Sequence, residues 1–293
     1  MDGISPISPQ DLYERLGTAS APVLIDMRRA PAFAASEVMI VGAIRRPPDE
    51  FERWRRDLPT NRPIVVHCAR GHEVSQDAAR ALSMAGFDAA YLEGGIEAWQ
   101  ALNLPLRRKL GAAPGKWVTR ERPKIDRIAC PWLIRRFIDP EAEFIYVPAD
   151  QVCRVAEETG ATPYDIDGVA FSHEGERCSF DAVLRIYGIR DPALDRLATI
   201  VRGADTSRHD LAPQCAGLFA VSLGLSANFP DDHEMLEHGM VMYDALYTWC
   251  RSLHLVPQPA ARDPQLAVNA VQGGHAWLKF QRRMRSARFR ATG

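Results

Sequence analysis

Residues 64–75 read IVVHCARGHEVS and bring a cysteine to the junction of a buried strand and a helix. The run IVVHC is compact and β-branched, as buried strands are, and Ser75 is suited to begin the following helix as its N-cap. VLID at residues 23–26 has the character of a second buried strand. Helical periodicity covers residues 9–16, 75–84 and 96–102. Strands that alternate with helices in this way predict an α/β fold, a parallel sheet with helices on both faces.

The composition narrows the class of protein. A length of 293 residues predicts two domains. Lys and Arg number 36 against 37 Asp and Glu, so the balance of charge disfavours a nucleic-acid partner. No apolar run is long enough to span a membrane, and the N-terminus shows no secretory signal. The six cysteines contain no CxxC pair, which indicates reduced thiols, so we expect a cytoplasmic protein with no membrane partner.

The sequence divides into two expected domains and a tail. We expect the first domain over residues 1–108, a linker over 109–115 and a second domain over 116–255. The second domain is predicted to be helix-rich α+β. Its expected helices cover residues 131–138, 150–159, 191–201, 211–223 and 231–253, and its β-like segments cover 144–148, 169–173 and 178–184. The Pro-containing, basic tail over 256–293 is either solvated or the contact for an anionic partner.

Cys68 is the expected centre of chemistry in the first domain. A loop that wraps between a strand and a helix N-terminus aims backbone N–H groups at the sulfur, which stabilises a thiolate or a persulfide anion. Arg70 adds a positive charge within reach, and Gly71 permits the positive φ that such a loop needs. The alternative is a buried, inert thiol at the end of a strand.

Four motifs in this half occur in the order found in single-domain rhodaneses. They are DMR at residues 26–28, VGAI at 41–44, HCARGH at 67–72 and YLEGGIEAW at 91–99. The resemblance covers nearly all of residues 5–108 and implies a rhodanese-like fold with sulfurtransferase activity. Cys68 would then take sulfur from thiosulfate or another sulfane-sulfur donor, hold it as a persulfide and pass it to a thiol acceptor. The catalytic loop implied by this resemblance contains Cys68, Arg70, Gly71 and His72.

Two positions depart from the rhodanese pattern. Glu73 stands where many active members carry Arg or Thr, and an acid there opposes an anionic donor unless its side chain points outward. Ser36, Glu37 and Val38 replace the Gly-His-Ile of the family. The sequence therefore favours persulfide chemistry at Cys68 more strongly than it favours thiosulfate as the donor.

The second half contains a group of potential metal ligands. His233 and Glu237 are four residues apart on the flank of an expected helix, beside an apolar stripe. The stripe consists of Leu236, Met240, Tyr243, Tyr247 and Cys250. His173 is our candidate for a third ligand, and the set would suit divalent Fe, Mn or Zn as a cofactor. The alternative is a helix capped by Asp231 or Asp232 with solvated acids and a hydrogen-bonded His233.

A basic segment precedes these ligands. Pro131 suits the first turn of a helix, which would place Cys130 at the N-cap, as either a reactive thiol or a small buried side chain. Arg120, Arg122, Lys124 and Arg127 either bind an oxyanion or are solvated.

Several strings of the second half resemble the C-terminal domain of chromate resistance protein B. They are KIDRIACPWLI at 124–134, FSH at 171–173, VRGADT at 201–206 and MYDALY at 242–247, and the similarity spans roughly residues 116–253. This resemblance implies chromate or another oxyanion as a ligand or signal.

The two halves together support two functions. One is an enzyme, a sulfurtransferase whose second domain binds metal or oxyanion. The other is a non-catalytic chromate or redox sensor, in which the oxyanion-binding residues would be Arg120, Arg127, Arg202 and Arg208. A nucleic-acid regulator that uses the basic tail is a third, less favoured alternative.

Overall fold

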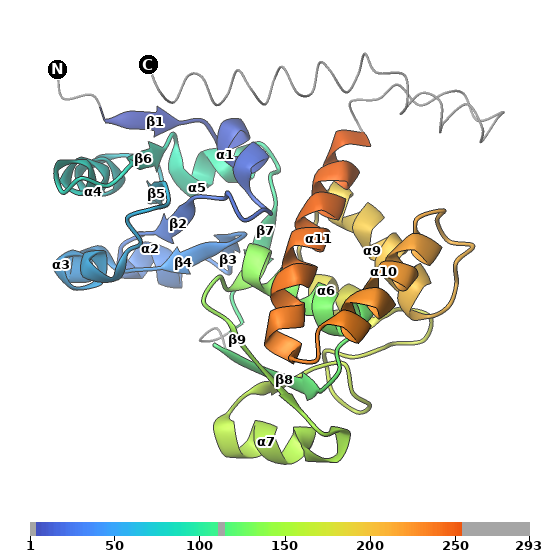
Figure 1. Cartoon of the computed structure of the whole chain (residues 1–293). Coiled ribbons are helices and arrows are strands. Elements are labelled where there is room, and N and C mark those ends of the chain that lie inside the picture. Colours follow the sequence, from blue (N-terminus) through green and yellow to red (C-terminus); the bar gives the residue numbers. More distant parts are fainter. Residues whose placement is uncertain (1–3, 111–114, 254–293) are drawn as a thin grey trace. The chain divides into compact units, whose positions relative to one another are not determined.

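The computed structural model describes residues 4–110 and 115–253. In the first half of the chain, five strands form one sheet. Its strands are all parallel and lie in the order β1, β6, β5, β2, β4 (Figure 1). Their bounds are Ser5–Ile7 for β1, Ala89–Leu92 for β6, Ile64–His67 for β5, Val23–Asp26 for β2 and Ala43–Arg45 for β4. The predicted parallel sheet is confirmed.

Helices cover both faces of this sheet. Because successive side chains of a strand point to opposite faces, Leu24 and Val65 pack in one apolar core, while Ile25 and Val66 pack in another. The first core contains residues of α1 (Pro9–Arg15) and α5 (Gly95–Ala101). The second contains residues of α3 (Phe51–Trp54) and α4 (Glu73–Met84). The other elements include α2 (Ala30–Ala34), two 3-10 turns on either side of α3, and an antiparallel pair of β3 (Val38–Ile40) and β7 (Leu106–Arg108).

The second half is rich in helices, as predicted. A small parallel sheet contains β10 (Thr162–Pro163), β8 (Lys116–Arg120) and β9 (Glu143–Val147), in that order. The helices are α6 (Ile125–Leu133), α7 (Val152–Thr159), α8 (Ser179–Tyr187), α9 (Pro192–Asp205), α10 (Cys215–Asn228) and α11 (Asp232–Ser252). A π-helical turn over Ile134–Ile138 follows α6 directly.

The core of this half surrounds Trp132. Its fully buried ring lies within 6.5 Å of the rings of Phe137, Phe180, Tyr243 and Tyr247, measured between centroids. Its indole N–H donates to Asp244 at 2.8 Å, so the polar atom of this large side chain is satisfied. The apolar stripe predicted on α11 is confirmed, since all five of its residues are buried.

Three local predictions are wrong. Residues 178–184 are not a strand but the start of α8, because the Asp181 carboxylate accepts the Cys178 backbone N–H at 3.1 Å in a capping box. Residues 169–173 form no strand beyond a single bridge between Phe171 and Tyr164. Ser75 is not an N-cap, because α4 begins two residues earlier, after His72.

Cys130 also differs from its expected position. The helix α6 begins at Ile125, so Pro131 lies inside it and Cys130 is an interior residue, not an N-cap. Pro131 leaves the carbonyl of Arg127 without its helical donor, and the Tyr146 hydroxyl lies 3.5 Å from that oxygen. Burial raises the pKa of the Cys130 thiol well above its usual value, so this residue lacks the acidity of a reactive cysteine.

The expected tail over 256–293 lies outside the described residues, as do 111–114 of the expected linker. In the described part of the chain, no helix has the length and apolar character needed to cross a membrane.

Candidate functional site

Cys68 follows directly after β5 at the edge where the parallel strands end. Its side chain is 7% exposed, and its sulfur lies 3.3 Å from the hydroxyl of Ser75, which is itself buried. The Ser75 hydroxyl also donates to the carbonyl of His72 at 3.1 Å. This hydroxyl can turn and donate to the sulfur when Cys68 is a thiolate. Ser75 is therefore a partner of the thiol and not the helix cap that its type suggested.

The loop between Cys68 and α4 carries a row of free amides. Within the described residues, the N–H groups of residues 69–74 donate to no protein acceptor. The carbonyls of Cys68 and Ala69 are held by the N–H groups of Ile96 and Glu97, at 3.1 and 3.0 Å. The loop is thus fixed by its carbonyls and keeps its N–H groups free, beside the N-terminus of α4. Consecutive amides of this kind bind anions.

Glycines make this loop compact. Gly71 has a φ of +70°, and a Cβ there would lie 2.6 Å from the carbonyl oxygen of Leu92. Gly95 has a φ of +58°, and a Cβ there would lie 2.5 Å from the carbonyl oxygen of Cys68. Both positions therefore need glycine for conformation and for space, and the positive φ of Gly71 was predicted from the sequence.

The other predicted loop residues have exposed side chains. The Arg70 side chain is 70% exposed and forms an ion pair with Glu97 at 3.2 Å. His72 is exposed and precedes α4 without a capping hydrogen bond from its side chain. Glu73 is also exposed. Gln76, which sequence reasoning missed, donates its side-chain amide to the carbonyl of Gly71 at 2.9 Å.

A buried ion pair supports the strand ends below this loop. Asp26, at the end of β2, pairs with Arg28 at 2.6 Å, and both side chains are at most 2% exposed. His67 is the register partner of Asp26 on β5 and is fully buried. Burial lowers the pKa of His67, which the Asp26 carboxylate only partly offsets, so the imidazole is neutral near pH 7.

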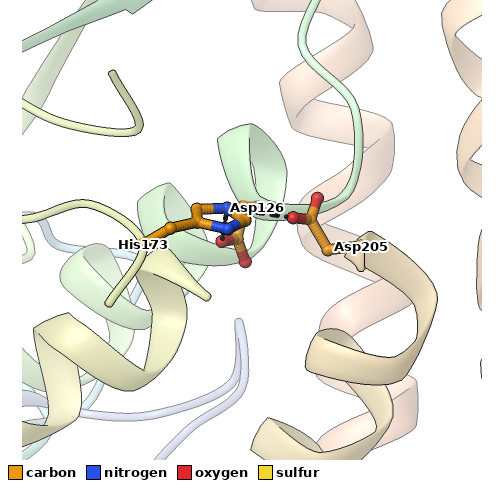
Figure 2. A group of neighbouring side chains, drawn as sticks. All are labelled: Asp126, His173 and Asp205. Carbon is orange, nitrogen blue, oxygen red and sulfur yellow. Dashed lines mark ion pairs between the residues drawn. The ribbon is translucent and has the colours of Figure 1, made fainter. Parts of the chain in front are cut away.

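A second group of side chains converges in the helix-rich half (Figure 2). His173 Nε2 lies 3.1 Å from a carboxylate oxygen of Asp205 and 3.5 Å from one of Asp126. A carboxylate oxygen of Asp165 also lies 3.5 Å from the same nitrogen. Asp126 is in the first turn of α6, Asp205 is the last residue of α9, and His173 lies in the segment before α8. Three separate segments therefore supply one cluster, whose ligand atoms from Asp126, His173 and Asp205 lie within 4.8 Å of one another.

The electrostatics of this cluster are unusual. Burial raises the pKa of Asp126 well above its ordinary value, and the nearby Asp205 and Asp165 raise it further. The hydrogen bonds to Asp165 and Asp205 raise the pKa of His173 to about 10. Beside them is a pocket of about 420 Å³, lined by Arg120, Asp165 and His173 among others.

The structure does not bring together the metal ligands named from the sequence. Of that set, only His173 is in the cluster. His233 stacks edge-on against Tyr146 at 5.4 Å between ring centroids, and Glu237 pairs with Arg135 at 2.8 Å. Asp231 accepts the N–H of Glu234 at 2.8 Å, in agreement with the alternative of a capped helix. Helical spacing placed His233 and Glu237 on one flank but carried no information on which distant residues that flank faces.

The four arginines named for an oxyanion are each paired with a carboxylate. Arg120 and Arg127 both contact Asp165, at 3.3 and 3.2 Å. Arg202 pairs with Asp181 at 2.6 Å and Arg208 with Asp210 at 2.9 Å. Arg120 and Arg127 therefore share one carboxylate, while Arg202 and Arg208 pair with two others. An oxyanion site built from these four arginines stays a prediction.

Known proteins match the two halves separately. Residues 8–102 match the rhodanese-like domain, and residues 117–250 match the C-terminal domain of ChrB. A curated relative, the protein ChrB of Cupriavidus metallidurans, is 35% identical over 147 residues, which cover 50% of this chain and 44% of the relative. This chain thus spans less than half of that relative's length. Both family resemblances found in the sequence are confirmed.

Solved structures resemble the first half. A rhodanese-related protein from Thermoplasma volcanium is 28% identical, with a TM-score of 0.31, over 35% of this chain and 96% of that one. A rhodanese-like domain protein from Staphylococcus aureus is 24% identical, with a TM-score of 0.30, over 33% of this chain and 91% of that one.

Proposed function

We propose that this chain, which joins a rhodanese-like domain to a ChrB C-terminal domain, is a sulfurtransferase whose Cys68 carries sulfur as a persulfide. The observation that supports this most is the arrangement around one sulfur atom. Cys68 lies at the start of a loop whose N–H groups at residues 69–74 have no acceptor among the described residues, and a buried Ser75 hydroxyl lies 3.3 Å from its sulfur. These groups favour an anionic sulfur over a neutral one.

The reaction has two displacement steps. In the first, the Cys68 thiolate attacks the outer sulfur of the donor, an S–S bond forms, and the donor leaves with the electron pair of its broken bond. That leaving group is sulfite for thiosulfate and a thiolate for a persulfide donor. In the second step, an acceptor thiolate attacks the outer sulfur and Cys68 leaves as a thiolate. No net oxidant or reductant is required, and the negative charge stays at the loop throughout.

The donor that suits this loop best carries little negative charge. Glu73 adds an acid in the first turn of α4, and Arg70 is engaged with Glu97. A dianion such as thiosulfate therefore meets less attraction here than in a loop that carries a free arginine. We favour a low-molecular-weight or protein persulfide as the donor and a thiol as the acceptor, in the cytoplasm. The ChrB C-terminal domain would connect this sulfur chemistry to chromate.

A turnover assay tests the proposal. The full chain is supplied with thiosulfate or cysteine persulfide and a thiol acceptor, and the sulfite or sulfide released is measured. Cys68→Ser should abolish turnover with both donors. Cys153→Ser is the matched control, because Cys153 is an exposed free cysteine on α7, and this variant should keep full activity. Turnover that survives in Cys68→Ser, or is absent from the unaltered chain with every donor, would reject the enzyme in favour of the sensor.

A further inference from the structure

We propose that Asp126, His173 and Asp205 bind a divalent first-row transition-metal ion. The cluster is separate from Cys68 and is not required by the sulfur-transfer reaction. Its three residues come from the start of α6, the segment before α8 and the end of α9, and Figure 2 shows both carboxylates beside the same imidazole. The proposal goes beyond the function above and stands or falls independently of it.

An unsatisfied buried oxygen is the first reason. Asp126 is 1% exposed, and one of its carboxylate oxygens accepts the backbone N–H of Ser179 at 2.5 Å. The other oxygen, Oδ1, is buried and has no hydrogen-bond partner among the described residues. An unpaired oxygen on a buried carboxylate is costly, and a cation held by Oδ1 together with Oδ2, the oxygen that lies 3.5 Å from His173, would remove that cost.

The distribution of charge is the second reason. Within the described residues, Asp126 and Asp205 have His173 as their only cationic partner, because no Lys or Arg lies within ion-pair distance of either carboxylate. Arg120 and Arg127 both form ion pairs with Asp165 instead. Asp205 is also the last residue of α9, where the helix dipole disfavours negative charge. A divalent cation would balance these two carboxylates.

The spacing of the ligand atoms fits an ion. Adjacent ligands at about 2.0–2.2 Å from a common tetrahedral or octahedral ion lie about 2.8–3.6 Å apart. His173 Nε2 lies 3.1 Å from Asp205 Oδ2 and 3.5 Å from Asp126 Oδ2, and the ligand atoms of all three residues lie within 4.8 Å of one another. Two carboxylates and one imidazole suit Mn²⁺, Fe²⁺ or Zn²⁺, whereas Mg²⁺ and Ca²⁺ prefer oxygen ligands alone.

The surroundings support this ligand set. Asp165 accepts a hydrogen bond from the Ser179 hydroxyl at 2.7 Å and pairs with the Arg127 guanidinium at 3.2 Å, so its negative charge is already balanced. Its Oδ1 lies 3.5 Å from His173 Nε2, so a third carboxylate stands beside the nitrogen that would bind the ion. The His173 side chain is 41% exposed, and the residue lines the 420 Å³ pocket. An ion bound here would therefore have access to water or a small ligand.

Metal titration of the full chain tests the proposal. The protein is treated with a chelator, dialysed and titrated with Mn²⁺, Zn²⁺ and the spectroscopic probe Co²⁺, while calorimetry and metal analysis give affinity and stoichiometry. We expect one ion per chain. Loss of a supporting residue around a metal usually costs about 10–100-fold in affinity, so Asp205→Asn should weaken binding by at least about 100-fold. Glu237→Gln is the matched control in the same half and should bind normally.

Two further measurements keep the result interpretable. Circular dichroism of Asp205→Asn establishes that the variant is folded, and His173→Gln provides a second ligand variant. Cys68→Ser should bind metal as the unaltered chain does, which separates this test from that of sulfur transfer. No binding of any of the three ions by the folded chain would overturn the proposal. The proposal would also be overturned if Asp205→Asn and His173→Gln each bound metal as tightly as the unaltered chain does. The cluster would then be only a hydrogen-bonded network of His173 and three carboxylates.

Discussion

The hydroxyl oxygen of Ser75 lies 3.3 Å from the sulfur of Cys68, with both side chains buried at the point where β5 turns into α4. Six residues separate them, and the N–H groups of these six donate to no acceptor in the part of the chain that the structure describes. The Ser75 hydroxyl and the N–H groups of this loop are donors that would stabilise a negative charge on that sulfur.

Removal of the Ser75 hydroxyl should slow sulfur loading. A hydrogen bond to a charged group contributes about 1.5–3 kcal/mol, so Ser75→Ala should lower the rate of persulfide formation by about 10–100-fold. The rate is measured by rapid mixing with a donor. Ser83→Ala, at an exposed position of the same helix, is the control and should load normally. A normal rate in Ser75→Ala would show that the hydroxyl does not act on the thiolate.

A side chain at Gly71 should damage both stability and activity. The left-handed φ alone costs a non-glycine residue about 1–2 kcal/mol, and a Cβ 2.6 Å from the Leu92 carbonyl adds a clash. Gly86→Ala is a matched control, because Gly86 has a φ of +89° but no atom within 4 Å of an added Cβ. Urea unfolding should show a larger loss for Gly71→Ala than for Gly86→Ala. Equal losses would mean that the loop is not tightly packed against β6.

Neutralising Glu73 should improve the use of thiosulfate. A charge in the first turn of a helix interacts with an anion there by about 0.3–1 kcal/mol, so Glu73→Gln should raise kcat/KM for this dianion by about 2–5-fold at low salt. The gain should be smaller for cysteine persulfide and should shrink as salt is added. An equal gain for both donors at all salt concentrations would exclude the electrostatic explanation.

His67 should make the folded state sensitive to mild acid. Burial holds its folded pKa below the unfolded value of about 6.5, so below pH 6.5 the unfolded chain binds a proton that the folded chain does not. Stability from the neutral imidazole is therefore present above pH 6.5 and is lost as the pH falls towards the folded pKa. The free energy of unfolding is compared at pH 5, 6 and 7 for the unaltered chain and His67→Gln. The difference between them should change over this range, and parallel pH profiles would contradict the prediction.

Local patterns were enough to predict the backbone around Cys68. The strand, the loop and the helix are consecutive in the sequence, so the positive φ of Gly71 and a loop with free N–H groups could be predicted from it, while a role of these residues in sulfur transfer stays a prediction. The parallel sheet followed for the same reason, from short β-branched runs between helical segments. Gln76 was missed because its side chain reaches back to a carbonyl five residues earlier.

The second site could not be predicted in the same way. Asp126 and Asp205 stand in strings that the sequence analysis quoted, but they are 79 residues apart, and only tertiary packing brings both to His173. Residues 178–184 were predicted to be β-like, but the capping box of Cys178 and Asp181 begins a helix there. A proline inside α6 similarly concealed where that helix begins.

The mass of the intact chain after one exposure to a sulfane-sulfur donor tests the central claim most directly. The account predicts that the chain gains one sulfur atom, that an added thiol removes it, and that Cys153→Ser gains it as well. Cys68→Ser should gain none. A chain that stays at its original mass with thiosulfate and with persulfide donors, or a Cys68→Ser variant that still takes up the sulfur, would contradict it.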